Sequence, residues 1–179
     1  MARMLAPLAR SVGNMLARGT VVLANSAGKM QSLQVRLLSG EAKDGVEHFE
    51  PYGFTSAPLS GAEHVTFFFG GDRSHGVTVV VADRRYRLQG LQSGEVALHD
   101  DQGTRLVLKR GGVVEVVAAT KVRMVTPLLE VTGEIKADGN ITDQVPSGGK
   151  SMAAMRSTYN THTHPGDSGG TTGTPNQGM

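Results

Sequence analysis

The hydrophobic residues of this chain follow two different periods. In residues 1–17 the apolar positions recur at spacings of three and four, which places them on one side of a short helix. These positions are Leu5, Leu8, Val12, Met15 and Leu16. We expect this helix to pack on its own domain or on a sister subunit; the alternative is a helix that lies on a membrane surface. Further along, the apolar runs are short and alternate with turn residues, which predicts an all-β protein.

Residues 18–94 contain apolar runs of strand length separated by turns. The runs are GTVVLANSAG, SLQVRLLSG, EHVTFFFGG and HGVTVVVADRRYRLQG. Residues 41–61 interrupt them with the Gly, Pro and Ser content of a long loop. Phe67 and Phe69 would share one face of a strand, so we expect both in the core. Strands of this length and spacing predict a small closed barrel of the OB-like kind.

The sequence GGDRSHG, residues 70–76, is predicted to be a hairpin loop between two apolar strands. A Gly-rich loop with an arginine could also hold a phosphate, but no helix start follows it, as such loops require. The upstream histidines, His48, His64, His75 and His99, show no spacing shared by metal ligands. Neither feature therefore predicts a binding site in the barrel.

Residues 95–145 have a different texture, with short strands separated by turn residues at regular intervals. In LEVTGEIKADGNI, residues 129–141, apolar and polar side chains alternate, so one face of the strand would be apolar and the other would be polar. The segment is too short for one chain to wind a stable solenoid, because such units bury their apolar face only against neighbours. The pattern favours an intertwined triple-stranded β-helix made by three chains with cyclic symmetry. An ordinary β-sheet packed on the barrel is the alternative, and periodicity alone does not decide between the two.

The amino-acid composition argues against several kinds of binding partner, metal site and cellular location. The net charge of +2 is too small to indicate nucleic acid or an anionic membrane as the main partner. The absence of cysteine excludes disulfides and thiolate metal sites, and it fits a protein kept in a reducing cytosol. Arg3, Pro7, Arg10 and Arg18 interrupt the apolar start, so we expect neither an export signal nor a membrane span. Aromatic residues make up 4% of a chain with 24 glycines, which favours strands and turns over a large globular core.

The segment NTHTHPG near the C-terminus contains the strongest candidate for chemistry. In an extended segment, residues two apart point to the same side, so His162 and His164 can face one ion while Thr161 and Thr163 face away. Two imidazoles leave a transition metal under-coordinated, and no Cys or Glu nearby completes a zinc site. Three chains meeting on an axis would supply six nitrogens, which suits an octahedral ion such as iron(II), cobalt or nickel. Without such assembly, the pair is better interpreted as a solvated turn before Pro165.

The residues that follow, GDSGG, match the frame around the nucleophilic serine of trypsin-like proteases. Their context does not fit catalysis by Ser168, because few residues follow it, too few for the strand and specificity pocket of that class. Nothing around His48 or His64 resembles the histidine motif of these enzymes either. A metal-dependent hydrolase would need an open coordination position, which six histidines would eliminate. We therefore expect no catalytic residues and no enzyme activity.

The order of these features resembles the central spike proteins in the baseplates of contractile phage tails. GGDRSHG is similar to a loop in the barrel of that family, LEVTGEIKADGNI to its β-helix strands, and NTHTHPG to its terminal His-x-His apex. The resemblance covers essentially the whole chain, and the last two motifs in this order make it specific. The Gly- and Thr-rich tail after His164 departs from the family pattern, which leaves its role open.

The resemblance implies a homotrimer with four parts along each chain. They are the N-terminal helix at 1–17, an OB-like barrel at 18–94, a triple-stranded β-helix shaft at 95–145 and a metal-bound apex at 146–179.

The resemblance also implies a set of bound ions. An iron ion shared by three chains would be held by His162 and His164, which match the paired histidines of the family. Calcium and chloride are further ions of the family, and Asp143 and Asp167 are candidate calcium ligands that match no motif.

The implied function is mechanical. When the tail contracts, the spike at the baseplate tip of the virion would puncture the host outer membrane, with a baseplate hub protein as its other partner and assembly in the host cytoplasm. An ion on the threefold axis would tie three chain ends together, and few aromatic residues suit a shaft that must pass lipid without anchoring in it. The alternative function is an OB-type single-stranded nucleic-acid binding protein, which the scarcity of aromatic residues disfavours.

Overall fold

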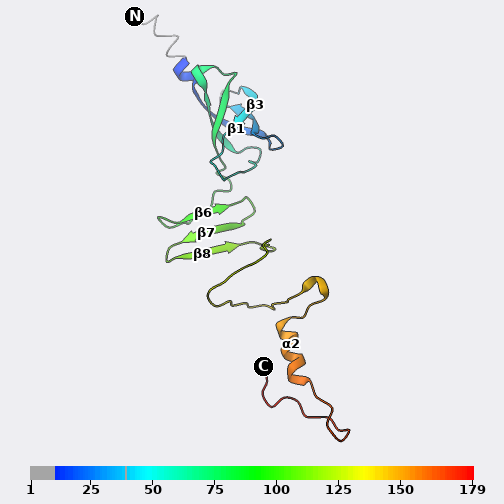
Figure 1. The fold of residues 1–179 in the computed structure, drawn as a ribbon. Helices are drawn as coiled ribbons and strands as arrows, with labels where there is room; N and C mark the ends of the chain where they lie inside the picture. The colour runs from blue at the N-terminus through cyan, green and yellow to red at the C-terminus, as the bar shows by residue number, and fades with distance from the viewer. Residues whose placement is uncertain (1–10, 39) are drawn as a thin grey trace, which may run out of the picture. The chain divides into compact units, whose positions relative to one another are not determined.

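The computed structural model describes residues 11–38 and 40–179, and it is mostly β-structure (Figure 1). The chain divides into two compact units, Met1–Val122 and Arg123–Met179. The strands are β1 (Leu16–Asn25), β2 (Gln31–Leu37), β3 (Ala42–His48), β4 (Glu63–Phe68), β5 (Gly76–Ala82), β6 (Val96–His99), β7 (Arg105–Lys109) and β8 (Val113–Val117). The helical elements with defined bounds are η1 (Phe69–Gly71), η2 (Val145–Ser147) and α2 (Met152–Thr161).

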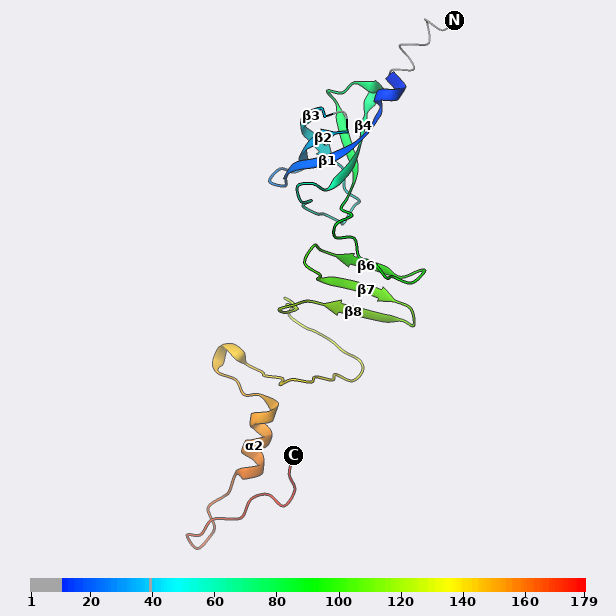
Figure 2. The same cartoon turned by 180° about the vertical axis from the view of Figure 1, so that it is seen from behind.

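Strands β1 to β5 form a closed barrel in the order β1-β2-β3-β5-β4. Figures 1 and 2 show the barrel from two sides. Neighbouring strands run antiparallel except β3 and β5, which pair in parallel. β1 closes the barrel because it pairs with β2 along one edge and with β4 along the other, and a register shift between Val21 and Leu23 bends it. The closed barrel predicted from the strand pattern is confirmed.

The barrel core is built from alternate residues of its strands. In β2, every second residue is buried, beginning at Gln31 and ending at Leu37, and those between are more exposed. The buried hydrophobic cluster consists of Val21, Leu33, Val35, Leu37, Val46, Ala62 and Phe68. The predicted hairpin loop at residues 70–76 is also present, since β4 and β5 pair on either side of it. Gly70 and Gly71 take positive φ values of 64° and 75° in this loop, which glycine permits without strain.

Strand β3 corrects the prediction that residues 41–61 form one long loop. Ala42–His48 pairs with β2 on one side and, at its end, with β5 on the other. Only Val46 and His48 of this strand are buried, so its sequence AKDGVEH contains little apolar content. A strand that contributes two side chains to a core does not show the hydrophobic alternation on which the prediction relied.

The prediction that Phe67 and Phe69 belong to the core is wrong. Their side chains are 43% and 61% exposed, whereas Phe68 between them is 1% exposed. The inward positions of β4 are the even-numbered ones, and two of these, His64 and Thr66, are polar. With three consecutive phenylalanines, hydrophobicity does not show which alternate positions point into the barrel, and the prediction chose the outward-facing ones.

A buried chain of hydrogen bonds joins three of the polar residues inside the barrel. The Nδ1 atom of His64 lies 2.8 Å from Thr66 Oγ1, which lies 2.8 Å from Thr78 Oγ1 on β5. All three residues are at most 1% exposed. Because buried polar groups are costly unless they are paired, this chain lets the barrel hold polar side chains at inward positions.

Much of the predicted N-terminal helix, including Leu5 and Leu8, lies outside the described residues. Residues 11–14 are helical, and Ser11 donates a hydrogen bond of 2.6 Å from its hydroxyl to the Gly70 carbonyl. Leu16 was predicted on the helix but is the first residue of β1, where it pairs with Phe67 of β4. Pairing with the edge of β4 therefore overrides the helical spacing at the end of this segment.

Strands β6, β7 and β8 form an antiparallel sheet with an exposed apolar face. The strand register places six aliphatic side chains opposite one another on this face: Val96, Leu98, Leu106, Leu108, Val114 and Val116. Each of the six is between 36% and 61% exposed. A contiguous exposed apolar face of this kind is typical of a contact surface.

Residues 118–140 follow β8 without regular secondary structure. Among the described residues, no backbone hydrogen bond joins this segment to any other part of the chain. Its apolar side chains are open to solvent, with Val125 82% and Ile135 68% exposed. The intertwined β-helix over residues 95–145 stays a prediction. No helix within the described residues has the length and apolar content to span a membrane.

We predict that Gly19→Ala destabilises the barrel by about 1–3 kcal/mol, the usual cost of overpacking. A Cβ at Gly19 would lie 2.0 Å from the carbonyl oxygen of Arg36 and 2.7 Å from His64 Nε2. Because the Arg36 oxygen belongs to the neighbouring strand, β1 and β2 would have to separate to relieve the overlap. Urea unfolding followed by circular dichroism measures the effect. Gly13→Ala is the matched control, since a Cβ there meets nothing within 4 Å; equal midpoints for the two variants would contradict this packing.

We also predict that the barrel loses stability as the pH falls below 6.5. Burial lowers the pKa of His64 from its ordinary value of 6.5, and the Arg36 carbonyl offsets this only in part. The unfolded chain therefore takes up a proton at a higher pH than the barrel does, so this contribution is complete above pH 6.5 and is lost below it. Urea midpoints at about pH 7.5 and about pH 5 should differ less in His64→Gln than in the wild type. An identical pH dependence in both would refute the assignment.

Candidate metal centre at the C-terminal tip

Helix α2 leads directly to the predicted histidine pair. The Ser151 hydroxyl caps its start by accepting a hydrogen bond of 3.1 Å from the backbone N–H of Ala154. The helix ends at Thr161, and His162 already has an extended backbone with ψ of 151°. This helix was not predicted, although a serine followed by the good helix formers Met-Ala-Ala-Met is a signal that could have found it.

The imidazole of His162 is held against the end of the helix. Its Nδ1 lies 2.5 Å from the carbonyl oxygen of Tyr159, and its ring packs on the Tyr159 ring with centroids 5.3 Å apart. A carbonyl oxygen can only accept, so Nδ1 carries the proton and donates it. The lone pair of Nε2 is therefore directed away from the helix and available to a ligand.

His164 lies beside His162 and is fixed through its backbone. The two ring centroids are 4.9 Å apart and the rings are nearly perpendicular, at 88°. The His164 N–H donates a hydrogen bond of 2.8 Å to Thr172 Oγ1, and the Thr172 N–H donates one of 2.9 Å to the His164 carbonyl. The segment is extended only from His162 onward, since Thr161 is still helical. The structure thus brings the two predicted residues together, and their role as metal ligands stays a prediction.

The sequence GDSGG forms the turn that follows the histidines. The Gly166 N–H donates a hydrogen bond of 2.7 Å to the Gly170 carbonyl, and Gly169 takes a φ of 79°. Pro165 and Thr171 pair across the base of the turn. Within the described residues, the side-chain hydrogen bond of Ser168 goes to Asp167 Oδ1 at 3.4 Å, with no histidine in that arrangement. The motif therefore reverses the chain and lacks the geometry of a protease nucleophile.

After this turn the tail returns to helix α2. The backbone N–H of Met179 donates a hydrogen bond of 2.9 Å to Asn160 Oδ1, and Asn160 Nδ2 donates one of 3.5 Å to the Met179 carbonyl. The Gly- and Thr-rich tail, whose role the sequence left open, thus packs beside the helix that presents His162. It fixes the backbone of the histidine segment from both ends.

The histidine pair provides only part of a coordination shell. No group of three or more His, Cys, Asp or Glu side chains within the described residues is placed to hold a metal ion in a single chain, and this includes Asp143 and Asp167. Two imidazoles nevertheless offer the nitrogen ligands that iron, cobalt, nickel and zinc accept. The residues fit a metal that further chains help to bind.

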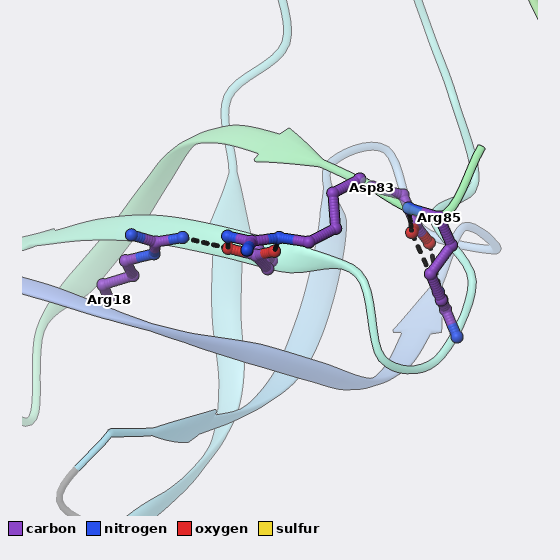
Figure 3. Close-up of polar contacts among 5 residues, drawn as sticks. Arg18, Asp83 and Arg85 are labelled. Carbon is purple, nitrogen blue, oxygen red and sulfur yellow. Dashed lines mark hydrogen bonds and ion pairs between the residues drawn. The ribbon is translucent and has the colours of Figure 1, made fainter. Parts of the chain in front are cut away.

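Away from the tip, the strongly perturbed carboxyl group is Glu63 of β4. Hydrogen bonds from Arg84 and Arg18 lower the pKa of Glu63 to about 2. Figure 3 shows this group and, beside it, the ion pair between Asp83 and Arg85, with Nη2 and Oδ2 2.5 Å apart. The arginines come from β1 and from the segment after β5, so the ion pairs link three parts of the barrel wall. Structural ion pairs of this kind account for the shift without a role in proton transfer.

Comparison with known proteins places the chain in a family. The family described as Bacteriophage Mu Gp45, N-terminal, matches residues 18–85, the stretch that forms the barrel. The baseplate puncturing device gp45 of Escherichia phage Mu is 38% identical over 192 residues, which cover 96% of this chain and 93% of that protein. The Mu-like prophage FluMu protein gp45 of Haemophilus influenzae is 41% identical over 110 residues, covering 62% of this chain and 60% of that one.

The match to the phage Mu protein spans the barrel, the sheet, the tip and the tail together. This chain therefore belongs to the family of the phage Mu baseplate puncturing protein gp45. The resemblance inferred from its barrel loop, its alternating segment and its histidine pair is confirmed.

Proposed function

We propose that this chain is the central spike of a contractile-tail baseplate and that it punctures the host outer membrane when the tail contracts. The support is its relation, over nearly its whole length, to a protein named as a baseplate puncturing device. The chain's location is then the baseplate tip of the virion, and its protein partner there is a baseplate hub component. The function is structural and needs no catalytic step.

The observation that supports assembly of three chains is that the backbone of residues 118–140 makes no hydrogen bond to other backbone groups among the described residues. Backbone N–H and C=O groups in folded proteins are almost always paired, and this segment has no backbone partner among the described residues. Its alternating apolar side chains also need a surface to cover them. An intertwined triple-stranded β-helix supplies both, because each chain gives its neighbours a strand and an apolar face.

The exposed face of the sheet β6-β7-β8 supports the same arrangement. Three such faces turned toward a common axis would form an apolar core from the six aliphatic side chains of each copy. At roughly 25 cal/mol for each Å² of apolar surface removed from water, such a core would contribute strongly to the trimer. A stiff shaft would follow from this closely packed interior.

The tip would be closed by a metal ion on the threefold axis. Two imidazoles from each of three chains make six nitrogens, which suits an octahedral ion, and iron is our assignment. His162 and His164 would hold it, with the Nε2 atom of His162 free because its Nδ1 is bonded to Tyr159. Calcium and chloride are further candidate ions of the shaft or tip, without assigned residues.

Such a tip would give the spike its mechanical property. Three loose chain ends would deform under load, whereas directional bonds from three chains to one ion hold them at a point. The ion's contribution is structural, and the chain's part is to present the imidazoles on a fixed backbone. A narrow, stiff end concentrates the force of contraction on a small area of membrane.

We predict that the purified protein contains three chains and about one transition-metal ion per particle, the ratio that follows from counting ligands. Light scattering gives the particle mass, and elemental analysis of the same sample gives the metal content. A monomeric particle would refute the spike arrangement. A trimer with three metal ions would refute the shared site while leaving the trimer in place.

We further predict that replacing both His162 and His164 with Ala removes the metal and leaves the trimer assembled. Most of the exposed apolar surface that assembly would bury lies upstream of the tip, so the mass and the circular dichroism spectrum should be unchanged. His99→Ala is the matched control, because that exposed histidine lies on β6 and should not affect metal content. Dissociation of the double variant would show that the metal, rather than the shaft, holds the chains together.

A further inference from the structure

Helix α2 has a narrow apolar stripe that continues into the histidine pair. Its large apolar side chains are Met152, Met155 and Tyr159, and each is between 39% and 44% exposed. His162 follows at the next position of the same stripe. The spacings along this series are three, four and three residues, which is the a/d pattern of a coiled-coil seam.

Within the described residues, no other element covers the apolar stripe of this helix. It is 10 residues long and has no buried residue. Isolated helices shorter than about 12–15 residues are marginal in water even with favourable sequences, so most helical stability in proteins comes from packing of an apolar face. The Ser151 cap and the tail contact at Asn160 lie outside the stripe and leave it uncovered.

We propose that α2 packs against the α2 helices of two further copies in a parallel three-helix bundle that positions the metal ligands. This rests on the proposed assembly of three chains, and it adds a defined interface to it. Met152, Met155 and Tyr159 form successive layers on the axis, and His162 forms the last layer. The bundle thus delivers the free Nε2 of each His162 to the axis with the Tyr159 carbonyl holding the ring.

The pattern of the stripe favours like helices over other occupants. A helix that covers a sheet or a globular core has a wide apolar face, with three or four apolar positions in every two turns. A helix with only two such positions in every two turns has a narrow seam, which fits other helices of the same kind. The charged residue of α2, Arg156, lies beside the seam, and Ala153, Ala154 and Ser157 face away from it. Three identical helices with uncharged seams can therefore meet without burying a charge.

Single-cysteine variants of the full chain test this proposal, because the chain has no cysteine of its own. Met155→Cys places three thiols around the axis, close enough for one disulfide between two chains, whereas Ser157→Cys places them on the outer side of the helix. After mild oxidation of dilute particles, we expect about two thirds of the Met155→Cys chains to run as linked pairs on a denaturing gel. The Ser157→Cys chains should remain single.

Light scattering of the same samples separates two kinds of failure. Trimers in which Met155→Cys stays unlinked would overturn the bundle and leave the spike assembly standing; the stripe would then face lipid, another baseplate protein or the chain's own shaft. Linked Ser157→Cys chains would overturn the assigned face of the helix. Particles of single mass would overturn both the bundle and the proposed assembly.

A second pair of variants tests whether the bundle positions His162. Met155→Glu would place three carboxylates on the axis and should lower the metal content per trimer by more than half, while the particle mass stays that of a trimer. Ser157→Glu adds the same charge on the outer face and should leave the metal content unchanged. Full metal content in Met155→Glu would show that the histidines reach the ion without the helix, which would overturn the positioning role.

Discussion

The structure depends on where the backbone of residues 118–140 finds its hydrogen-bond partners. An extended segment cannot pair with itself, and it has no backbone partner among the described residues. The same stretch exposes apolar side chains such as Val125 and Ile135. Both requirements are met together when identical strands wind around one another. In the proposed trimer, the shaft would therefore be a property of the assembly, and a single chain would supply one third of it.

The barrel is different because it satisfies its own requirements. Its five strands close on themselves, its apolar residues form one cluster, and three of its inward polar residues bond to one another, although His64 Nε2 has no hydrogen-bond partner among the described residues. The contrast explains how one chain can contain both kinds of structure. In the proposed function, the self-sufficient barrel would give a baseplate component a folded surface to bind, and a shaft formed from several copies would become stiff only on assembly.

The sequence predicted those features that a local pattern determines, such as the closed barrel and the turn at residues 70–76. It missed β3, whose inward residues Val46 and His48 are too few to show alternation, and it chose the wrong face of β4 around Phe68. In both cases the deciding contact lies on a strand far away in sequence. The pairing of His162 with His164 was predictable because it is set by neighbouring residues. Helix α2 was missed although its cap and helix-forming residues are local.

The tip shows how neighbouring residues decide what a motif can do. GDSGG alone suggests a nucleophile, yet between the histidines and the tail it makes a reversal that returns the chain to Asn160. That reversal fixes the His164 backbone through Thr172, while the end of α2 fixes the His162 ring through Tyr159. The His162 ring and the His164 backbone are thus held by different elements. If an ion binds this pair, as proposed, the cost in conformational entropy of ordering its ligands would be small.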